Sequence, residues 1–303
     1  MNPILVEQTK DLIEKYYPSQ NKASQDIGYS ASMLSDYLKG KFKGNLETFE
    51  KALTQWIART KQAHAKKQIP IVETSQLNRI INALSLAHAE SDITLIVDDA
   101  GGGKTTAARY YTDQNPRTTI YIPVVKGMNA KTLTLQIAEK LGLDTYRINQ
   151  QALIHNTATA LSEKKMLVIL DEADYLKGDA LEFSRRLVND LGQSGLALIG
   201  LPRLTGTIQN LKNDHRQLES RIGVYLALGG LSKQDAGKIA RAVWPDVDKE
   251  IIEAIYSVAK TDVRQFTKIM ERSQNIMAVN KQDEISLEVV EMAASMVMRR
   301  NWR

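Results

Sequence analysis

The sequence predicts an α/β fold with a central parallel sheet, preceded by an N-terminal helix-turn-helix domain and followed by a C-terminal helical lid. Between residues 71 and 230, five short apolar runs alternate with amphipathic helical patterns, which is typical of such a sheet. The runs are continuous, as expected for strands covered on both faces. No strand-like run follows Leu231. The expected strands are Ile93–Val97, Thr119–Pro123, Met166–Leu170, Leu196–Ile199 and Val224–Leu228.

Residues 1–59 are predicted to form a helix-turn-helix DNA-binding domain. Gly28 divides two short helical patterns, and Ser30 is placed to cap the second, which Gly40 ends. Two short helices around a glycine-containing turn are typical of this motif. Asn45 is placed to cap a longer helix.

The remaining boundaries follow from changes in composition. Residues 60–70 are polar and basic and end in Pro70, which indicates a linker. We expect the nucleotide-binding core over residues 71–230 and the helical lid over 231–303, with helices such as Lys249–Ala259 and Val263–Met277.

Composition narrows the classes of function. The net charge is +5, and residues 1–70 contribute 11 Lys and Arg against 7 Asp and Glu, which favours a polyanion such as double-stranded DNA but also occurs on ordinary surfaces. The absence of cysteine excludes disulfides and thiolate metal sites, and four scattered histidines do not suggest a histidine metal site. No apolar window approaches about 18 residues, so no membrane span is expected.

Residues 94–111, TLIVDDAGGGKTTAARYY, carry the strongest local motif, a phosphate-binding loop between a strand and a helix. The backbone of Ala100, Gly101, Gly102 and Gly103 is expected to cradle a phosphate, and Thr106 follows it into the helix. Lys104 would reach the β- and γ-phosphates of ATP, and Thr105 would bind Mg²⁺. The general motif has glycine where this chain has Asp98, whose carboxylate either points away or weakens binding. The alternative is a glycine-rich turn without a ligand.

A second motif, MLVILDEAD at residues 166–174, is an apolar strand that ends in acids. Asp171 would organise Mg²⁺ through its water shell, and Glu172 would activate the attacking water. A solvated strand end is the alternative. The MLVILDEAD motif lies about 60 residues after the phosphate-binding loop, and this spacing favours a role in ATP hydrolysis.

These motifs resemble those of AAA+ ATPases, and the order of regions along nearly the whole chain resembles the transposition regulators of that class. Val72–Thr74 is similar to the segment that leads into the core. Ser220–Ile222 resembles the arginine-finger box, which implies that Arg221 reaches the γ-phosphate of a neighbouring subunit, with Arg216 as the alternative. TDVRQF at 261–266 is similar to the second sensor, which implies that Arg264 contacts nucleotide in its own subunit. Either arginine could instead be an ordinary surface residue.

One position departs from the resemblance. Where the family usually has Gly-Asn after the fourth strand, this chain has Gly200 and Leu201. Because leucine cannot polarise water or phosphate, we expect ATP turnover to be slow or to depend on a partner.

Two surfaces are candidates for DNA contact. Short polar side chains and lysines of the helix-turn-helix could approach bases and phosphates, unless this domain binds protein instead. Lysines after the second strand could hold the DNA backbone, or could simply be solvated. These residues are Ser30, Ser32, Ser35, Lys39, Lys41 and Lys43 in the first surface, and Lys126, Lys131 and Thr132 in the second.

The resemblance implies an ATP-dependent, non-specific DNA-binding ATPase that oligomerises on DNA and recruits or activates a transposase. It implies the cytoplasm of a bacterial or phage-infected cell, with ATP and Mg²⁺ as cofactors and with DNA, further copies of the chain and a transposase as partners. A replication ATPase that loads a helicase and a non-catalytic, nucleotide-gated DNA-binding repressor are the alternatives.

Overall fold

The computed structural model describes residues 1–65, 69–210 and 216–297 of the 303. It divides into two compact units, Met1–Gln68 and Ile69–Arg303. None of the helices within the described ranges is long and apolar enough to cross a membrane.

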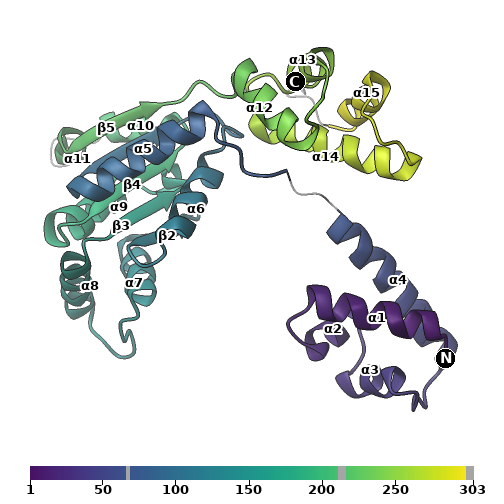
Figure 1. Cartoon of the computed structure of the whole chain (residues 1–303). Coiled ribbons are helices and arrows are strands. Elements are labelled where there is room, and N and C mark those ends of the chain that lie inside the picture. Colours follow the sequence, from purple (N-terminus) through teal and green to yellow (C-terminus); the bar gives the residue numbers. More distant parts are fainter. Residues whose placement is uncertain (66–68, 211–215, 298–303) are drawn as a thin grey trace. The chain divides into compact units, whose positions relative to one another are not determined.

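The first unit consists of helices α1 (Pro3–Tyr16), α2 (Gln20–Ile27), α3 (Ala31–Leu38) and α4 (Leu46–Ala65) (Figure 1). Gly28 ends α2 in the left-handed conformation, and the Ser30 hydroxyl accepts the Met33 N–H at the start of α3. This geometry is compatible with a helix-turn-helix. The core of the unit contains Leu12, Ala23, Leu34, Tyr37, Phe49, Leu53, Trp56 and Ile57.

Helix α4 differs from the prediction at its end. It continues to Ala65 and therefore occupies the first six residues of the segment predicted as a linker. Residues 60–65 contain no glycine or proline, and alanine, lysine and glutamine are good helix formers, so nothing in the sequence stops the helix there.

The second unit is built on a five-stranded parallel sheet with the order β2-β3-β4-β1-β5. All five predicted strands are present, with small shifts at their ends. They are β1 (Ile93–Val97), β2 (Thr119–Pro123), β3 (Leu167–Asp171), β4 (Gly195–Gly200) and β5 (Ile222–Ala227).

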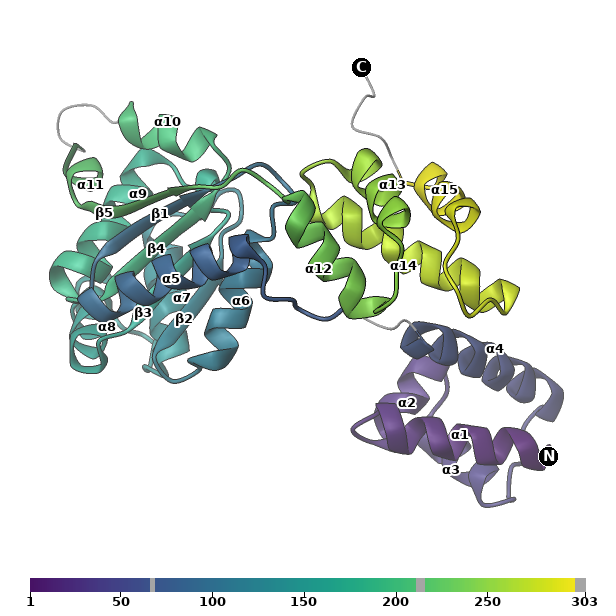
Figure 2. The same cartoon turned by 45° about the horizontal axis from the view of Figure 1, so that its top comes forward.

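Helices cover both faces of this sheet (Figure 2). Helices α5 (Ser75–Glu90) and α6 (Lys104–Gln114) pack against Ile96, Ile169 and Ile199 on one face. On the other face the helices pack against Leu95, Val168 and Leu198. These helices are α7 (Ala130–Leu141), α8 (Gln150–Lys164), η1 (Ala173–Tyr175), α9 (Gly178–Arg185), η2 (Arg186–Leu191), α10 (Arg203–Gln209) and α11 (Arg216–Ser220).

Strand β5 was expected to be covered on both faces, but it lies at an edge of the sheet and alternates half-buried with exposed residues. Tyr225 is 56% exposed there.

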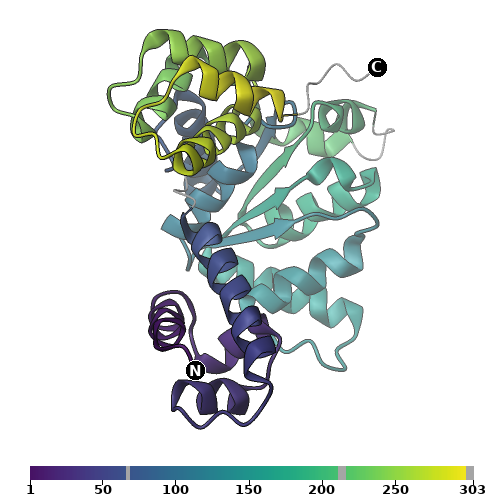
Figure 3. The same ribbon diagram turned by 90° about the vertical axis from the view of Figure 1, so that its right-hand side faces the viewer.

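A group of helices with its own apolar core follows β5, as predicted (Figure 3). Phe266, Ile269 and Met270 of α14 are completely buried within it. The helices are α12 (Lys233–Val243), α13 (Lys249–Ala259), α14 (Val263–Asn280) and α15 (Leu287–Ser295).

Candidate nucleotide-binding site

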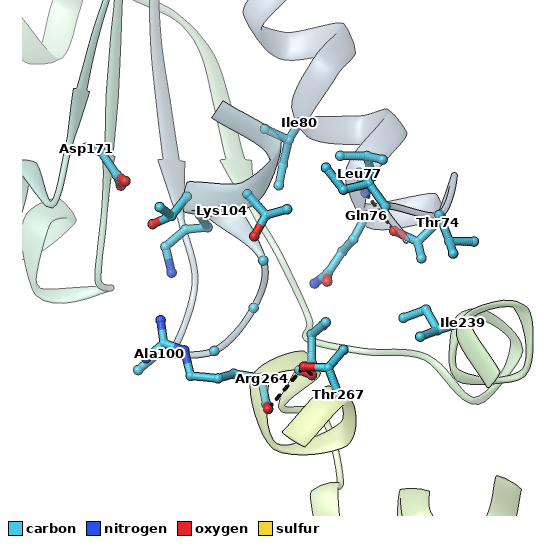
Figure 4. A pocket seen from close by; sticks show the side chains of 18 of the residues that line it. Thr74, Gln76, Leu77, Ile80, Ala100, Lys104, Asp171, Ile239, Arg264 and Thr267 are labelled. Atoms are coloured by element: carbon cyan, nitrogen blue, oxygen red, sulfur yellow. Dashed lines mark hydrogen bonds between the residues drawn. The ribbon is translucent and has the colours of Figure 1, made fainter. Parts of the chain in front are cut away.

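A cavity of about 470 Å³ lies where the phosphate-binding loop, the end of β3 and the start of α14 meet (Figure 4). Its size falls in the range usual for small-molecule and cofactor sites. One part is lined by the loop backbone and charged side chains, and another by apolar side chains, as a nucleotide with phosphates and a base requires. The predicted residues that line it are Ala100, Gly101, Gly102, Gly103, Lys104, Thr105, Thr106, Asp171, Glu172 and Arg264.

Lys104 lies inside the curve of the loop. Its Nζ donates to the carbonyls of Asp98 and Asp99, each at 2.9 Å. Burial lowers the pKa of Lys104, whereas the charges of Asp98 and Asp171 raise it and so oppose that effect. The ammonium is therefore held at the position where the loop would enclose a phosphate group.

Asp98, the departure from the general motif, is not among the residues that line this cavity. Its carboxylate accepts the Asp99 N–H at 2.9 Å and lies beneath Gly102, where an added Cβ would be only 1.8 Å from Asp98 Oδ2. Asp98 lines a separate cavity on the other side of the loop, together with Gly229 and Gly230. Gly102 must therefore be glycine because the Asp98 carboxylate fills the space beneath it.

The end of β3 places two acids at the cavity in different environments. Asp171 is buried, and its Oδ1 accepts the N–H of Glu172 at 3.0 Å. Glu172 is exposed and adopts a left-handed conformation with φ 57°. Its exposure leaves the Glu172 side chain accessible to water.

The position of Leu201 is fixed by a third acid. The Asp174 side chain is only 2% exposed, and its Oδ1 accepts the Leu201 N–H at 3.1 Å, while its Oδ2 accepts from Arg203 Nε at 2.8 Å. Asp174 and Leu201 both line the cavity. This hydrogen bond holds the backbone of Leu201 at the cavity, although the Leu201 side chain is apolar.

Oxygen ligands suitable for Mg²⁺ line the cavity, namely the Thr105 hydroxyl and the Asp171 carboxylate. The described residues contain no group of three or more His, Cys, Asp or Glu side chains that could hold a metal ion. This donor set suits Mg²⁺ bound mainly through phosphates and water, which is its usual mode in nucleotide sites.

Arg264 extends from the first turn of α14 toward the phosphate-binding loop (Figure 4). Its backbone N–H donates to the Gly101 carbonyl at 3.3 Å, so the lid helix contacts the loop directly. Arg264 is exposed, which leaves its guanidinium accessible to a bound phosphate.

Arg221 is separated from the cavity of its own chain. It is exposed and precedes Ile222, which pairs with Ile93 at the amino end of β1, whereas the phosphate-binding loop follows the carboxyl end of that strand. The two ends of a five-residue strand lie about 13–17 Å apart. The side chain of Arg216, the alternative, lies outside the described residues.

The two predicted DNA surfaces lie in different units. In the first, Ser32, Lys39, Lys41 and Lys43 are exposed, and Ser35 is half-buried. The Ser30 hydroxyl both caps α3 and lies 3.0 Å from the Ser32 hydroxyl.

In the second unit, Lys126 and Lys131 are exposed. The Thr132 hydroxyl is already engaged, because it accepts the Asn129 N–H at 2.9 Å in the capping box of α7. Thr132 therefore has a local structural role that the sequence interpretation did not assign.

Sequence reasoning assigned no contact to the apolar end of the cavity. A residue that lines a base pocket has the same character as a residue of the core, so the sequence held no separate signal for it. The apolar lining residues in question are Ile69, Pro70, Ile71, Val72, Leu77, Ile80, Ile239 and Val263. Other lining residues to which the sequence interpretation gave no contact are Thr74, Gln76, Tyr175, Thr267 and Glu271.

Comparison with known proteins agrees with this architecture. Residues 87–208 match the family described as AAA domain. Among solved structures, the Aeropyrum pernix ORC1 protein in complex with DNA has a TM-score of 0.57 at 18% identity, over 75% of this chain and 66% of that one. The Aeropyrum pernix ORC2 protein in its ADPNP-ADP complexes has a TM-score of 0.58 at 17% identity, over 77% of this chain and 70% of that one.

Relatives in sequence cover most of the chain. The Mu-like prophage FluMu DNA transposition protein B of Haemophilus influenzae is 24% identical over 85% of this chain and 91% of its own length. The ATP-dependent target DNA activator B of Escherichia phage Mu is 25% identical over 83% of this chain and 81% of its own length. This protein therefore has the AAA+ P-loop fold and is similar, over most of its length, to the B proteins of Mu-like phages.

Proposed function

We propose that this protein is an ATP-dependent, non-specific DNA-binding ATPase that oligomerises on DNA and recruits or activates a transposase. The observation that carries the proposal is the convergence of Lys104, Asp171, Glu172 and Arg264 on one cavity. The names of its relatives, a DNA transposition protein and an ATP-dependent target DNA activator, support this biological setting.

In this proposal each side chain of the cavity has its own part. Backbone N–H groups of the loop and the Lys104 ammonium bind the β- and γ-phosphates of ATP. Thr105 and Asp171 would hold Mg²⁺, which when bound would neutralise charge on the phosphates. Glu172 orients a water molecule for attack on the γ-phosphorus and accepts its proton as the bond to the β-γ bridging oxygen breaks. Arg264 stabilises the phosphate charge from the lid.

Arg221 completes the site of a neighbouring copy. Because it lies at the amino end of the strands, opposite the carboxyl end that carries its own cavity, it reaches a γ-phosphate only in another subunit. ATP binding thereby links subunits into an assembly on DNA, and hydrolysis releases them. The apolar Leu201 leaves turnover slow until DNA or a transposase alters the site.

Sedimentation of the full chain with non-specific duplex DNA tests this proposal in ATP, in ADP and without nucleotide. We expect large DNA-bound assemblies only in ATP, and we expect Glu172→Gln to prolong them by abolishing hydrolysis. Glu163→Gln, an exposed acid of α8, is the control. Assembly that ignores the nucleotide, or an unchanged turnover and DNA residence time in Glu172→Gln, would contradict the mechanism.

Co-purification separates the possible partners. Association with a transposase supports the proposal, whereas association with a helicase favours a replication ATPase. ATP binding without any turnover, with or without DNA, favours a nucleotide-gated repressor.

A further inference from the structure

Asp171 has a partner on each of its carboxylate oxygens. Oδ1 accepts the N–H of Glu172, as described above, and Oδ2 accepts the hydroxyl of Tyr121 at 2.7 Å. Tyr121 comes from the middle of β2, the strand that pairs with β3 in parallel. The side chain of Asp171 is thus fixed by its own strand end and by the neighbouring strand.

Tyr121 is in turn held by Arg109. The guanidinium carbon of Arg109 lies 5.5 Å from the centroid of the Tyr121 ring. Arg109 belongs to α6, the helix that begins at Lys104 and carries Thr105. The contact therefore joins the helix of the phosphate-binding loop to the acidic end of β3 through one phenol.

The phenol is a hydrogen-bond donor throughout the physiological pH range. Burial, together with the hydrogen bond to Asp171, raises the pKa of Tyr121 to about 12, although Arg109 opposes this. A neutral phenol donates its single proton to Asp171 and leaves the carboxylate its charge.

We infer that Tyr121 is a positioning residue that holds the Asp171 carboxylate in the orientation needed to bind the Mg²⁺ of the nucleotide complex; this inference rests on the proposed ATPase function. A carboxylate has about four lone-pair sites, and the two hydrogen bonds leave the others for the metal or its water shell. Partners that orient a ligand in this way typically change metal affinity by about 10- to 100-fold when they are removed.

The Tyr121 hydroxyl also opposes a direct pairing of Asp171 with Lys104. Asp171 is one of the carboxylates whose charge acts on the buried Lys104 ammonium. Without the hydrogen bond from Tyr121, the carboxylate is free to turn toward that ammonium. The two side chains would then neutralise one another, when each is needed for a different part of the nucleotide complex.

The test compares full-length Tyr121→Phe with Tyr111→Phe. Tyr111 is a matched control because it lies on α6, is 7% exposed and has its hydroxyl 3.0 Å from His88 Nδ1, away from the cavity. Binding of ATP is titrated calorimetrically over a range of Mg²⁺ concentrations and in EDTA. We expect Tyr121→Phe to raise about 10-fold the Mg²⁺ concentration at which the enhancement of ATP binding by Mg²⁺ is half-maximal. ATP binding in EDTA should be unchanged, and ATP turnover should be lower. Tyr111→Phe should match the wild type.

A double mutant tests whether Tyr121 acts through Asp171. In an Asp171→Asn background, Tyr121→Phe should have no further effect on Mg²⁺ dependence, because the group that it orients has lost its charge. An unchanged Mg²⁺ dependence in Tyr121→Phe, an equal shift in Tyr111→Phe or full additivity with Asp171→Asn overturns the inference alone. A wild-type protein whose ATP binding ignores Mg²⁺ overturns both the inference and the proposed function.

Discussion

Asp262 and Gly101 are in such close contact that a Cβ on Gly101 would lie 2.1 Å from Asp262 Oδ1. Gly101 belongs to the phosphate-binding loop, and Asp262 is the N-cap of α14, where its Oδ1 accepts the Gln265 N–H at 3.0 Å. The loop glycine is therefore required by the lid as well as by any phosphate. The phosphate-binding loop and the start of α14 therefore pack directly against each other.

Gly101→Ala should destabilise the nucleotide-free protein more than Gly103→Ala. Both glycines have positive φ, 89° and 85°, so alanine costs about 1–2 kcal/mol at either position. Only Gly101→Ala adds the clash with Asp262, since nothing lies within 4 Å of a Cβ on Gly103. Denaturant unfolding without nucleotide measures the difference. Asp262→Ser, which keeps an N-cap but shortens the side chain, should partly restore Gly101→Ala; equal stabilities of the two alanine variants would refute the contact.

Asp98→Gly, which restores the glycine of the general motif, should destabilise the protein without improving ATP affinity. The buried Asp98 carboxylate accepts the Asp99 N–H, and loss of a partner of this kind costs about 1–3 kcal/mol. Thermal unfolding and calorimetric titration with ATP measure the two effects. Asp99→Gly, at the exposed neighbouring position, is the control. A large gain in ATP affinity would show that the Asp98 charge acts on the phosphates.

Arg264 and Arg221 should differ in whether they act within one subunit or between subunits. Arg264→Ala should weaken ATP binding by about 10-fold, as expected for a lost charge-assisted hydrogen bond. Arg221→Ala should leave ATP binding of dilute protein unchanged and abolish turnover. Mixing Arg221→Ala with Glu172→Gln should restore part of the turnover, because intact active sites of the first then receive Arg221 from the second. The same mixture with Arg264→Ala in place of Arg221→Ala should stay inactive. Restored turnover in that mixture would show that Arg264 acts between subunits.

Asp235→Asn should destabilise the second unit at neutral pH but not in acid. Asp235 lies at the start of α12 and accepts both the N–H and the hydroxyl of Ser75, the first residue of α5. Burial raises its pKa, but the hydrogen bonds from Ser75 and Ser232 outweigh burial, so the pKa is lowered below its ordinary value of 3.8. The stabilisation is therefore present above about pH 4 and disappears as the pH falls through the lowered pKa.

At pH 7 the loss should be about 1–3 kcal/mol, as for hydrogen bonds to a charged group. Urea unfolding of both proteins between pH 3 and pH 7 measures it. A difference that stays constant down to pH 3 would show that the charge of Asp235 is not responsible.

Lys126→Ala and Thr132→Ala should separate DNA contact from local structure. If the exposed Lys126 contacts a phosphate, its loss lowers the slope of log affinity against log salt by about one. Thr132→Ala removes the capping box of α7 and should cost about 0.5–1.5 kcal/mol of stability with an unchanged slope. Filter binding across a salt series, together with thermal unfolding, measures both. An altered salt slope in Thr132→Ala would show that Thr132 itself contributes to the DNA surface.

The local elements of the nucleotide site could be predicted because their residues are consecutive. The run from Thr94 to Tyr111 contains the strand, the glycines and the helix start in one segment, and MLVILDEAD contains a strand and its terminal acids. The alternation of apolar runs with helical patterns likewise predicted all five strands and the helical region after them. In each case the chemistry depends on spacing along the chain, which a sequence shows directly.

What required the tertiary structure is the set of contacts between distant segments. Tyr121 meets Asp171 only because β2 and β3 are neighbours in the sheet, and Asp262 meets Gly101 only because α14 begins at the phosphate-binding loop. The sequence also left undetermined the direction of the Asp98 carboxylate, the hydrogen-bond partner of the Thr132 hydroxyl and the exposed face of β5. Strand order and packing decide them. Residue type and spacing determined the phosphate-binding loop and the acids at the end of β3. The tertiary fold determined which groups hold them in place.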